Sequence, residues 1–159
     1  MARQIWFLRH AEAEPHGTRT DAKRRLTERG ERQASAAGAA LVALGGQFER
    51  TLTSPKVRAA ETARIALGAP AEEFAPLADG LDGRSVIELA KTLDADGHLL
   101  LVGHEPQLSG IVGELTGARA DLKKGGIAVV RLEGGGGELA VLLRPREVFA
   151  VAGLPLDGH

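Results

Sequence analysis

Several features are missing from this sequence of 159 residues, and each absence excludes a class of protein. There is no cysteine, which rules out disulfide bonds, thiolate zinc sites and cysteine nucleophiles. Aromatic residues make up only 3 %, so leucine, valine, isoleucine and alanine must fill the core. No apolar run approaches the roughly 18 residues of a membrane span, and the first residues lack a signal-peptide pattern. We therefore expect a cytoplasmic protein that does not insert into a membrane.

An excess of charge of one sign is also missing. The formal net charge is −1, and no extended basic run occurs, which argues against nucleic acid as the main partner. What the chain does have is a hydrophobic content of 43 %, which is enough for a real core. The length suits one domain, which we expect to span residues 1–159.

A short apolar run near the start carries the first functional signal. Residues 5–8 (Ile-Trp-Phe-Leu) lack helical spacing and predict a strand that is buried on both faces. The run stops at Arg9 and His10. In open α/β sheets, ligands bind outside the carboxyl ends of the strands, and a cation beside an imidazole suits a phosphate-like anion. Taken alone, such a pair is more often a solvated strand boundary.

Two more predicted strands are followed by an arginine or a histidine. Residues 48–53 predict a strand that runs into Ser54 and Pro55, which we expect to be the N-cap and first residue of a helix over 55–67. This helix would carry Arg58 in its first turn, beside unpaired backbone N–H groups. The apolar run 98–102 predicts a third strand, which ends at His104.

The remaining pattern predicts an α/β fold. We expect helices over 28–44, with Thr27 as N-cap, and over 84–93, and a further helix from the apolar spacing between 108 and 115. A short strand near 73–75 and an antiparallel hairpin of 126–133 with 138–144 complete the prediction, while the tail from Pro145 onward is expected to be only partly ordered. Parallel strands in a three-layer α/β/α sheet would bring the three strand ends to one rim.

The candidate site therefore holds two arginines and two histidines. Arg58 alone would be an ordinary surface charge of a helix, and His104 alone would be an ordinary helix cap. Their coincidence with Arg9 and His10 at converging strand ends favours phosphoryl chemistry. The histidines lack helical i, i+4 spacing and have no carboxylate partner, so we expect no metal and no cofactor.

Four segments resemble motifs of the histidine phosphatase superfamily, in the order in which that family has them. Residues 8–12 (Leu-Arg-His-Ala-Glu) resemble its Arg-His-Gly motif, with Ala11 where glycine is commonest. Residues 26–30 resemble its Leu-Thr-x-x-Gly segment, residues 54–63 its Ser-Pro-x-x-Arg-Ala-x-x-Thr-Ala motif, and residues 103–106 its second histidine segment. The short chain, Ala11 and residues 21–25 resemble the branch of small SixA-type protein phosphohistidine phosphatases.

The resemblance implies a phosphoglycerate-mutase-like fold and a role for each residue. His10 would be the nucleophile that forms a phosphohistidine intermediate, while Arg9, Arg58 and His104 would hold the phosphoryl oxygens, with Arg25 reaching the pocket as well. A phosphate or sulfate ion would bind at the same place. The chemistry fits these residues, because an imidazole attacks only when neutral, and neighbouring arginines disfavour the imidazolium.

Larger family members carry a carboxylic general acid in the region that corresponds to residues 69–97. Here that region is short, and its candidates are Asp79 and Asp82, which lie beside glycines and could simply form turns. A weak acid matters less for phosphohistidine, whose P–N bond cleaves readily, than for an alkyl phosphate. The short region also leaves little material for a lid, so an open pocket would admit a histidine on a protein surface.

Three functions remain open at this point. The first is a phosphatase that acts on phosphohistidine in a phosphorelay-type signal-transduction protein. The second is the same chemistry on small phosphomonoesters, such as sugar or nucleotide phosphates. The third is a phosphate-binding module without catalysis, which would not need a nucleophile such as His10.

Overall fold

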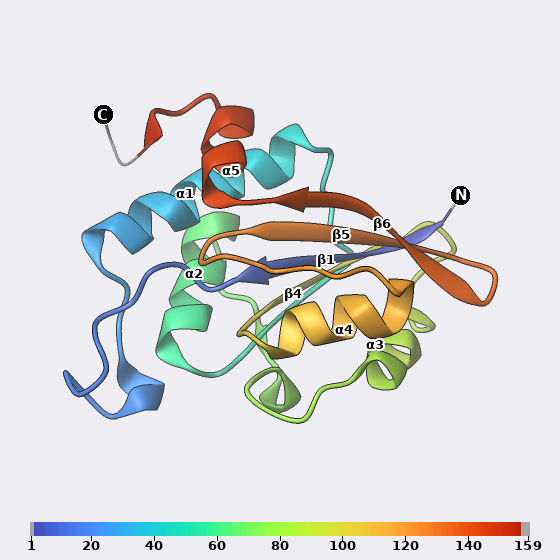
Figure 1. Cartoon of the computed structure of the whole chain (residues 1–159), viewed down its shortest axis with the longest axis horizontal. Coiled ribbons are helices and arrows are strands. Elements are labelled where there is room, and N and C mark those ends of the chain that lie inside the picture. Colours follow the sequence, from blue (N-terminus) through green and yellow to red (C-terminus); the bar gives the residue numbers. More distant parts are fainter. Residues whose placement is uncertain (1, 157–159) are drawn as a thin grey trace.

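One six-stranded sheet with helices on both faces forms the protein, as the computed structural model of the chain shows (Figure 1). The model describes residues 2–156. Along the chain the elements are β1 (Arg3–Arg9), the 3-10 helix η1 (Asp21–Lys23), α1 (Glu28–Ala43), β2 (Arg50–Thr53), α2 (Val57–Leu67), β3 (Glu72–Glu73), the 3-10 helix η2 (Ala75–Leu77), α3 (Gly83–Ala90), β4 (His98–Gly103), α4 (Gln107–Thr116), β5 (Ile127–Glu133), β6 (Gly136–Leu143) and α5 (Pro145–Ala152).

The strand order in the sheet is β3-β2-β4-β1-β5-β6. The first four strands of this order pair in parallel, whereas β5 runs antiparallel to β1 and to β6. The prediction of a mostly parallel sheet with a C-terminal antiparallel hairpin is therefore confirmed. Because β1 lies between β4 and β5, both of its edges are hydrogen-bonded, which buries the strand that leads to His10.

Alternate residues of β1 face two separate cores. Ile5 and Phe7 join the cluster under α3 and α4, whereas Trp6 and Leu8 join the cluster under α1, α2 and α5. A strand that is buried on both faces gives a continuous apolar run rather than an alternating one. The run at residues 5–8 has this origin, and Figure 1 shows the helices on the two sides of the sheet.

Several boundaries differ from the sequence prediction. The prediction of a partly ordered tail from Pro145 onward is wrong for residues 145–152, which form α5 and bury Val148 and Phe149 against α1 and the sheet. Its last part, residues 157–159, lies outside the described residues. The hairpin turn is also shorter than 134–137, because β6 already begins at Gly136. Within residues 2–156, no helix is both long and apolar enough to cross a lipid bilayer.

Close contact between α1 and α2 depends on a glycine. A Cβ atom on Gly38 would lie 2.3 Å from the carbonyl oxygen of Ala66 in α2, which is far inside van der Waals contact. Overpacking of this kind costs about 1–3 kcal/mol. Gly38→Ala is therefore expected to lower the free energy of unfolding by about that amount, measured by urea denaturation.

Gly110 in α4 provides the matched control. It is exposed, and a Cβ atom there would meet nothing within 4 Å. Since alanine is favoured over glycine inside a helix by about 0.5–1 kcal/mol, Gly110→Ala should stabilise the protein. Equal effects of the two substitutions would contradict the close helix contact.

Candidate active site

The two histidines meet because β1 and β4 are parallel neighbours in register. Arg9 pairs with Gly103, and the backbone N–H of His10 donates to the carbonyl oxygen of Gly103 over 2.9 Å. His10 and His104 therefore leave the sheet side by side, with ring centroids 5.1 Å apart. Both are buried, with 7 % and 9 % of their surface exposed. The strand pairing alone thus creates a two-histidine site at one rim of the sheet.

The protonation state of His10 follows from its hydrogen bond. Its Nδ1 lies 2.8 Å from the carbonyl oxygen of Ala11, which can only accept a hydrogen bond. In the neutral ring the proton therefore resides on Nδ1, and Nε2 carries the free lone pair. Burial lowers the pKa of His10 to about 3, and the charges of Arg58 and Arg9 act in the same direction. His10 is thus a neutral imidazole with an unprotonated Nε2.

The backbone after His10 is fixed by side chains of two helices. The N–H of Ala11 donates to Thr62 Oγ1 over 3.0 Å, and the N–H of Glu12 donates to Gln33 Oε1 over 2.9 Å. At the start of α1, a Cβ atom on Gly30 would lie 2.0 Å from the carbonyl oxygen of Glu12. The glycine of the Leu-Thr-x-x-Gly segment therefore allows α1 to begin against the backbone that follows His10. The predicted cap at Thr27 is confirmed, since its Oγ1 accepts from the N–H of Gly30.

Ser54 orients the second histidine instead of capping a helix. The prediction that a helix begins at Pro55 is wrong, because α2 begins at Val57 and Lys56 has the extended backbone of its N-cap. Ser54 Oγ lies 2.8 Å from His104 Nε2 and accepts a hydrogen bond from the N–H of Lys56. When the hydroxyl donates to Nε2, the proton of the neutral His104 ring resides on Nδ1. Burial, followed by the charges of Arg58 and Lys56, lowers the pKa of His104 to about 4.

Arginines from two elements surround this pair. Arg58 lies in the first turn of α2, as the sequence predicts, and is 6 % exposed. Arg9 is half-buried and donates to the carbonyl oxygen of Leu122 over 2.9 Å. Arg9 Nε, Arg58 Nε and His104 Nδ1 are buried and have no hydrogen-bond partner within residues 2–156. Buried donors of this kind call for an acceptor, and an oxyanion supplies several.

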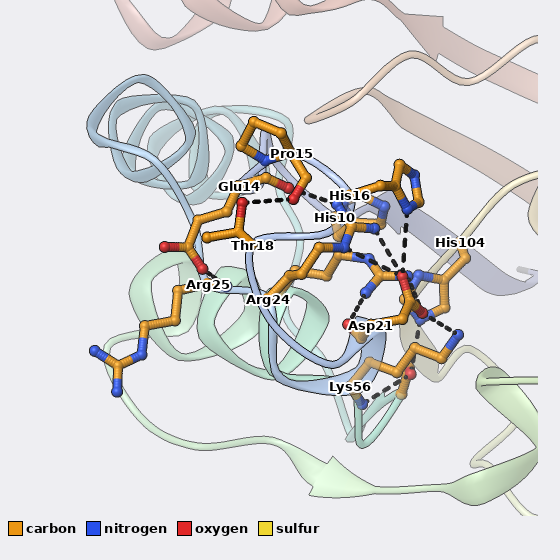
Figure 2. A network of polar contacts seen from close by, with 12 residues as sticks. His10, Glu14, Pro15, His16, Thr18, Asp21, Arg24, Arg25, Lys56 and His104 are labelled. Carbon is orange, nitrogen blue, oxygen red and sulfur yellow. Dashed lines mark hydrogen bonds and ion pairs between the residues drawn. The ribbon is translucent and has the colours of Figure 1, made fainter.

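The loop between β1 and α1 contributes residues that the sequence prediction missed (Figure 2). Arg24 is 7 % exposed and donates to the backbone oxygen of Glu14 and to Asp21 Oδ1. Arg25, the predicted candidate, is exposed, and its side chain points away from His10 and His104. Arg24 and Arg25 are neighbours of the same residue type, and they differ in burial. Because burial is not visible in the sequence, the sequence could not tell which of the two faces the site.

Asp21 lies closest to the site among the loop residues. Its Oδ2 is 3.2 Å from Lys56 Nζ and 3.3 Å from Arg58 Nη2, and its backbone oxygen accepts from Arg58 Nη1 over 2.8 Å. The sequence prediction assigned no role to Asp21 or Lys56. Their proximity depends on how a loop of irregular backbone folds back over α2, and no periodicity in the sequence encodes it.

The two candidates for a general acid do not join the site. Asp79 is exposed in the turn after η2, and within residues 2–156 it has no hydrogen bond or ion pair. Asp82 is the N-cap of α3, where its carboxylate accepts from the N–H of Ser85 over 2.9 Å. That hydrogen bond lowers the pKa of Asp82, which makes it a poor proton donor. Asp79 therefore lies in a turn and Asp82 caps a helix, and neither side chain reaches the histidines.

Comparison with known proteins agrees with this geometry. Residues 5–80 match the histidine phosphatase superfamily (branch 1). An uncharacterized protein of Picosynechococcus sp. is 36 % identical over 139 residues, which cover 80 % of this chain and 84 % of that protein.

Solved structures show the same fold at lower identity. The protein histidine phosphatase SixA in complex with tungstate has a TM-score of 0.80 at 24 % identity, covering 91 % of this chain and 99 % of that one. A phosphoserine phosphatase mutant of Entamoeba histolytica in complex with phosphoserine has a TM-score of 0.75 at 14 % identity, covering 91 % and 98 %. With its four motifs gathered at one rim of this fold, the chain belongs to the histidine phosphatase superfamily, and its architecture is that of the small SixA-type enzymes.

Proposed function

We propose that this phosphatase hydrolyses phosphohistidine on a phosphorelay-type protein in the cytoplasm, through a covalent phosphohistidine intermediate on His10. The observation that carries the proposal is the state of His10. This imidazole is buried and neutral, its Nδ1 is bonded to the carbonyl oxygen of Ala11, and its Nε2 is free to attack. A module that only binds phosphate needs no such nucleophile.

The first chemical step transfers the phosphoryl group to the enzyme. The lone pair of His10 Nε2 attacks phosphorus, the P–N bond of the substrate breaks in line, and the departing imidazole takes up a proton from solvent. Arg9, Arg58 and the Nδ1–H of His104 stabilise the charge on the three equatorial oxygens. Among residues 2–156, no group of three or more His, Asp or Glu side chains is arranged to hold a metal ion, and we propose that the site works without one.

The second step regenerates the enzyme. Water attacks the phosphorus in line, the bond to His10 Nε2 breaks, and phosphate leaves with the proton balance met by solvent. The same three donors stabilise this second transition state. Since the neutral ring of His10 is restored, each turnover ends with the nucleophile in the state in which it began.

The absence of a well-placed acid supports phosphohistidine as the substrate. Neither Asp79 nor Asp82 contacts His10, His104 or their arginines in the described part of the chain. An alkoxide leaving group needs a proton from such an acid, whereas the imidazole of phosphohistidine leaves readily. The alternative is a small phosphomonoesterase, and a fold relative that was solved with phosphoserine favours it.

Side-by-side hydrolysis separates these candidates. We expect kcat/KM for a histidine-phosphorylated protein to exceed that for phosphoserine, sugar phosphates and nucleoside monophosphates by about 100-fold or more. Phosphate release is the measurement. A higher kcat/KM for any of the monoesters would overturn the proposed substrate while leaving the phosphatase assignment in place.

His10→Ala provides the mechanistic control for the same assay. Turnover should be lost while phosphate binding is largely kept, because the arginines and His104 remain. Enzyme trapped during turnover should carry an acid-labile, base-stable phosphoryl group. His98→Gln, which changes a histidine at the opposite end of β4, should retain activity. Persistent turnover in His10→Ala would show that another residue is the nucleophile.

The adjacent arginines of the loop give a second, matched prediction. Arg24→Ala removes hydrogen bonds to Glu14 and Asp21 that hold the loop beside the site. Since hydrogen bonds to charged groups contribute about 1.5–3 kcal/mol, kcat/KM should fall about ten- to hundredfold. Arg25→Ala should change it less than about twofold, because that side chain is solvated. The reverse order of effects in steady-state kinetics would restore Arg25 as the residue that reaches the pocket.

The neutrality of both histidines is testable in the free enzyme. Burial lowers the pKa of His10 to about 3 and that of His104 to about 4, so both should remain neutral between about pH 5 and about pH 8. Their ring proton resonances, assigned by loss of signal in His10→Gln and His104→Gln, should therefore not shift over this range in an NMR titration. A midpoint near pH 6.5 for either ring would show that solvent and not the protein sets its charge.

A further inference from the structure

Within residues 2–156, Asp21 is the one acidic residue whose carboxylate contacts the guanidinium of Arg58 or Arg9. Its Oδ2 pairs with Arg58 at 3.3 Å and with Lys56 at 3.2 Å, and its Oδ1 accepts from Arg24 at 3.0 Å (Figure 2). His16 of the same loop is 3.8 Å away and exposed. The hydrogen bonds from Lys56 and Arg24 and the charge of Arg58 outweigh the effect of desolvation and hold the pKa of Asp21 well below its usual range. The carboxylate is therefore ionised at neutral pH.

The carboxylate of Asp21 is more exposed to solvent than the two histidines of the site, and its charge acts on His104. The side chain of Asp21 is 47 % exposed, whereas His10 and His104 are less than a tenth exposed. Attack by a buried nucleophile is in line, so the leaving group departs on the side away from His10 and toward solvent. Because Asp21 pairs with Arg58, a phosphoryl group held by Arg58 would bring the rest of the substrate near this carboxylate.

Two of the cations that Asp21 contacts depend on it for their ion pair. Lys56 and Arg24 make no ion pair in residues 2–156 other than the one to Asp21. Arg9 is at the opposite side of the histidine pair, near Leu122 and Asp121. Asp21 thus offsets one unit of the positive charge that Lys56, Arg24 and Arg58 carry together, and the group keeps a net positive charge for the phosphoryl oxygens.

We propose that Asp21 is a specificity-determining residue, which disfavours substrates with a second anionic group beside the phosphoryl group and favours a neutral or cationic leaving group. Imidazole is such a leaving group, and its N–H can donate to the carboxylate. Small polyanionic metabolites, such as phosphorylated carboxylic acids, are excluded by the same charge. The preference for phosphohistidine rests on the proposed function. The effect of Asp21 on the binding of small ligands does not.

Two ligands that differ by one carboxylate provide the test. Glycerol 3-phosphate and 3-phosphoglycerate share a three-carbon phosphomonoester, and only the second carries an additional carboxylate. Their dissociation constants are measured by calorimetric titration of the His10→Ala protein, so that neither ligand is hydrolysed. In a second His10→Ala protein that also carries Asp21→Asn, the affinity for 3-phosphoglycerate should rise about three- to tenfold relative to the affinity for glycerol 3-phosphate. This is the effect expected when the repulsion between two partly solvated unit charges is removed.

Three further variants separate specificity from simple positioning. Asp21→Glu keeps the charge and should keep the wild-type ratio, whereas the combination of Asp21→Asn with Lys56→Met should lose the gain, because the released cation is missing. Asp96→Asn, at an exposed turn beyond the opposite end of the sheet, should leave the ratio unchanged. If Asp21 only positions the loop, Asp21→Asn will weaken both ligands equally.

The proposal is overturned if Asp21→Asn leaves the ratio of the two dissociation constants unchanged. It is also overturned if the Asp21→Asn protein binds neither ligand. With His10 intact, Asp21→Asn should also lower kcat/KM for the phosphohistidine protein relative to that for glycerol 3-phosphate. If the enzyme does not hydrolyse phosphohistidine at all but the ratio of dissociation constants still shifts, the proposed substrate fails while the role of Asp21 stands. The two inferences can therefore fail separately.

Discussion

The hydrogen bond between the N–H of His10 and the carbonyl oxygen of Gly103 is the contact on which the site depends. It extends the parallel pairing of β1 with β4 by one residue past the end of β1, and so places His10 beside His104. A shift of this register by one residue would turn one of the two rings to the other face of the sheet. The hydrophobic pattern that buries both faces of β1 fixes that register, so the core packing also determines the geometry of the chemistry.

Burial and the neighbouring cations both keep the two histidines at this rim neutral. Buried cations and the low polarity of the surroundings disfavour the imidazolium at both histidines, and a neutral His10 is what nucleophilic attack requires. The same cations attract the phosphoryl group. Under the proposed function, one set of charges would keep His10 neutral for attack and bind the phosphoryl group, while Asp21 limits how far that positive charge extends toward solvent.

Much of the fold and the four central site residues could be predicted from the sequence, because strand ends and motif order carry that information. Arg9, His10, Arg58 and His104 each stand at a fixed offset from an element with a clear pattern. Arg24 and Asp21 do not, since they lie in an irregular loop whose path is set by side-chain contacts far apart in the sequence. The helix start at Val57 was missed for a related reason: Ser54 bonds His104, a partner fifty residues away.

The central position of β1 in the sheet has a consequence for how such an enzyme can change. Both edges of β1 are paired, so exposing the strand that leads to His10 requires opening of the sheet at its centre, at a free energy close to that of global unfolding. The segment that bears Asp21 has no buried residue in η1 and is held by polar contacts alone, which open at far lower cost. Sequence drift in residues 14–25 can thus explore new substrates while the reacting groups stay in place, so that recognition evolves apart from chemistry.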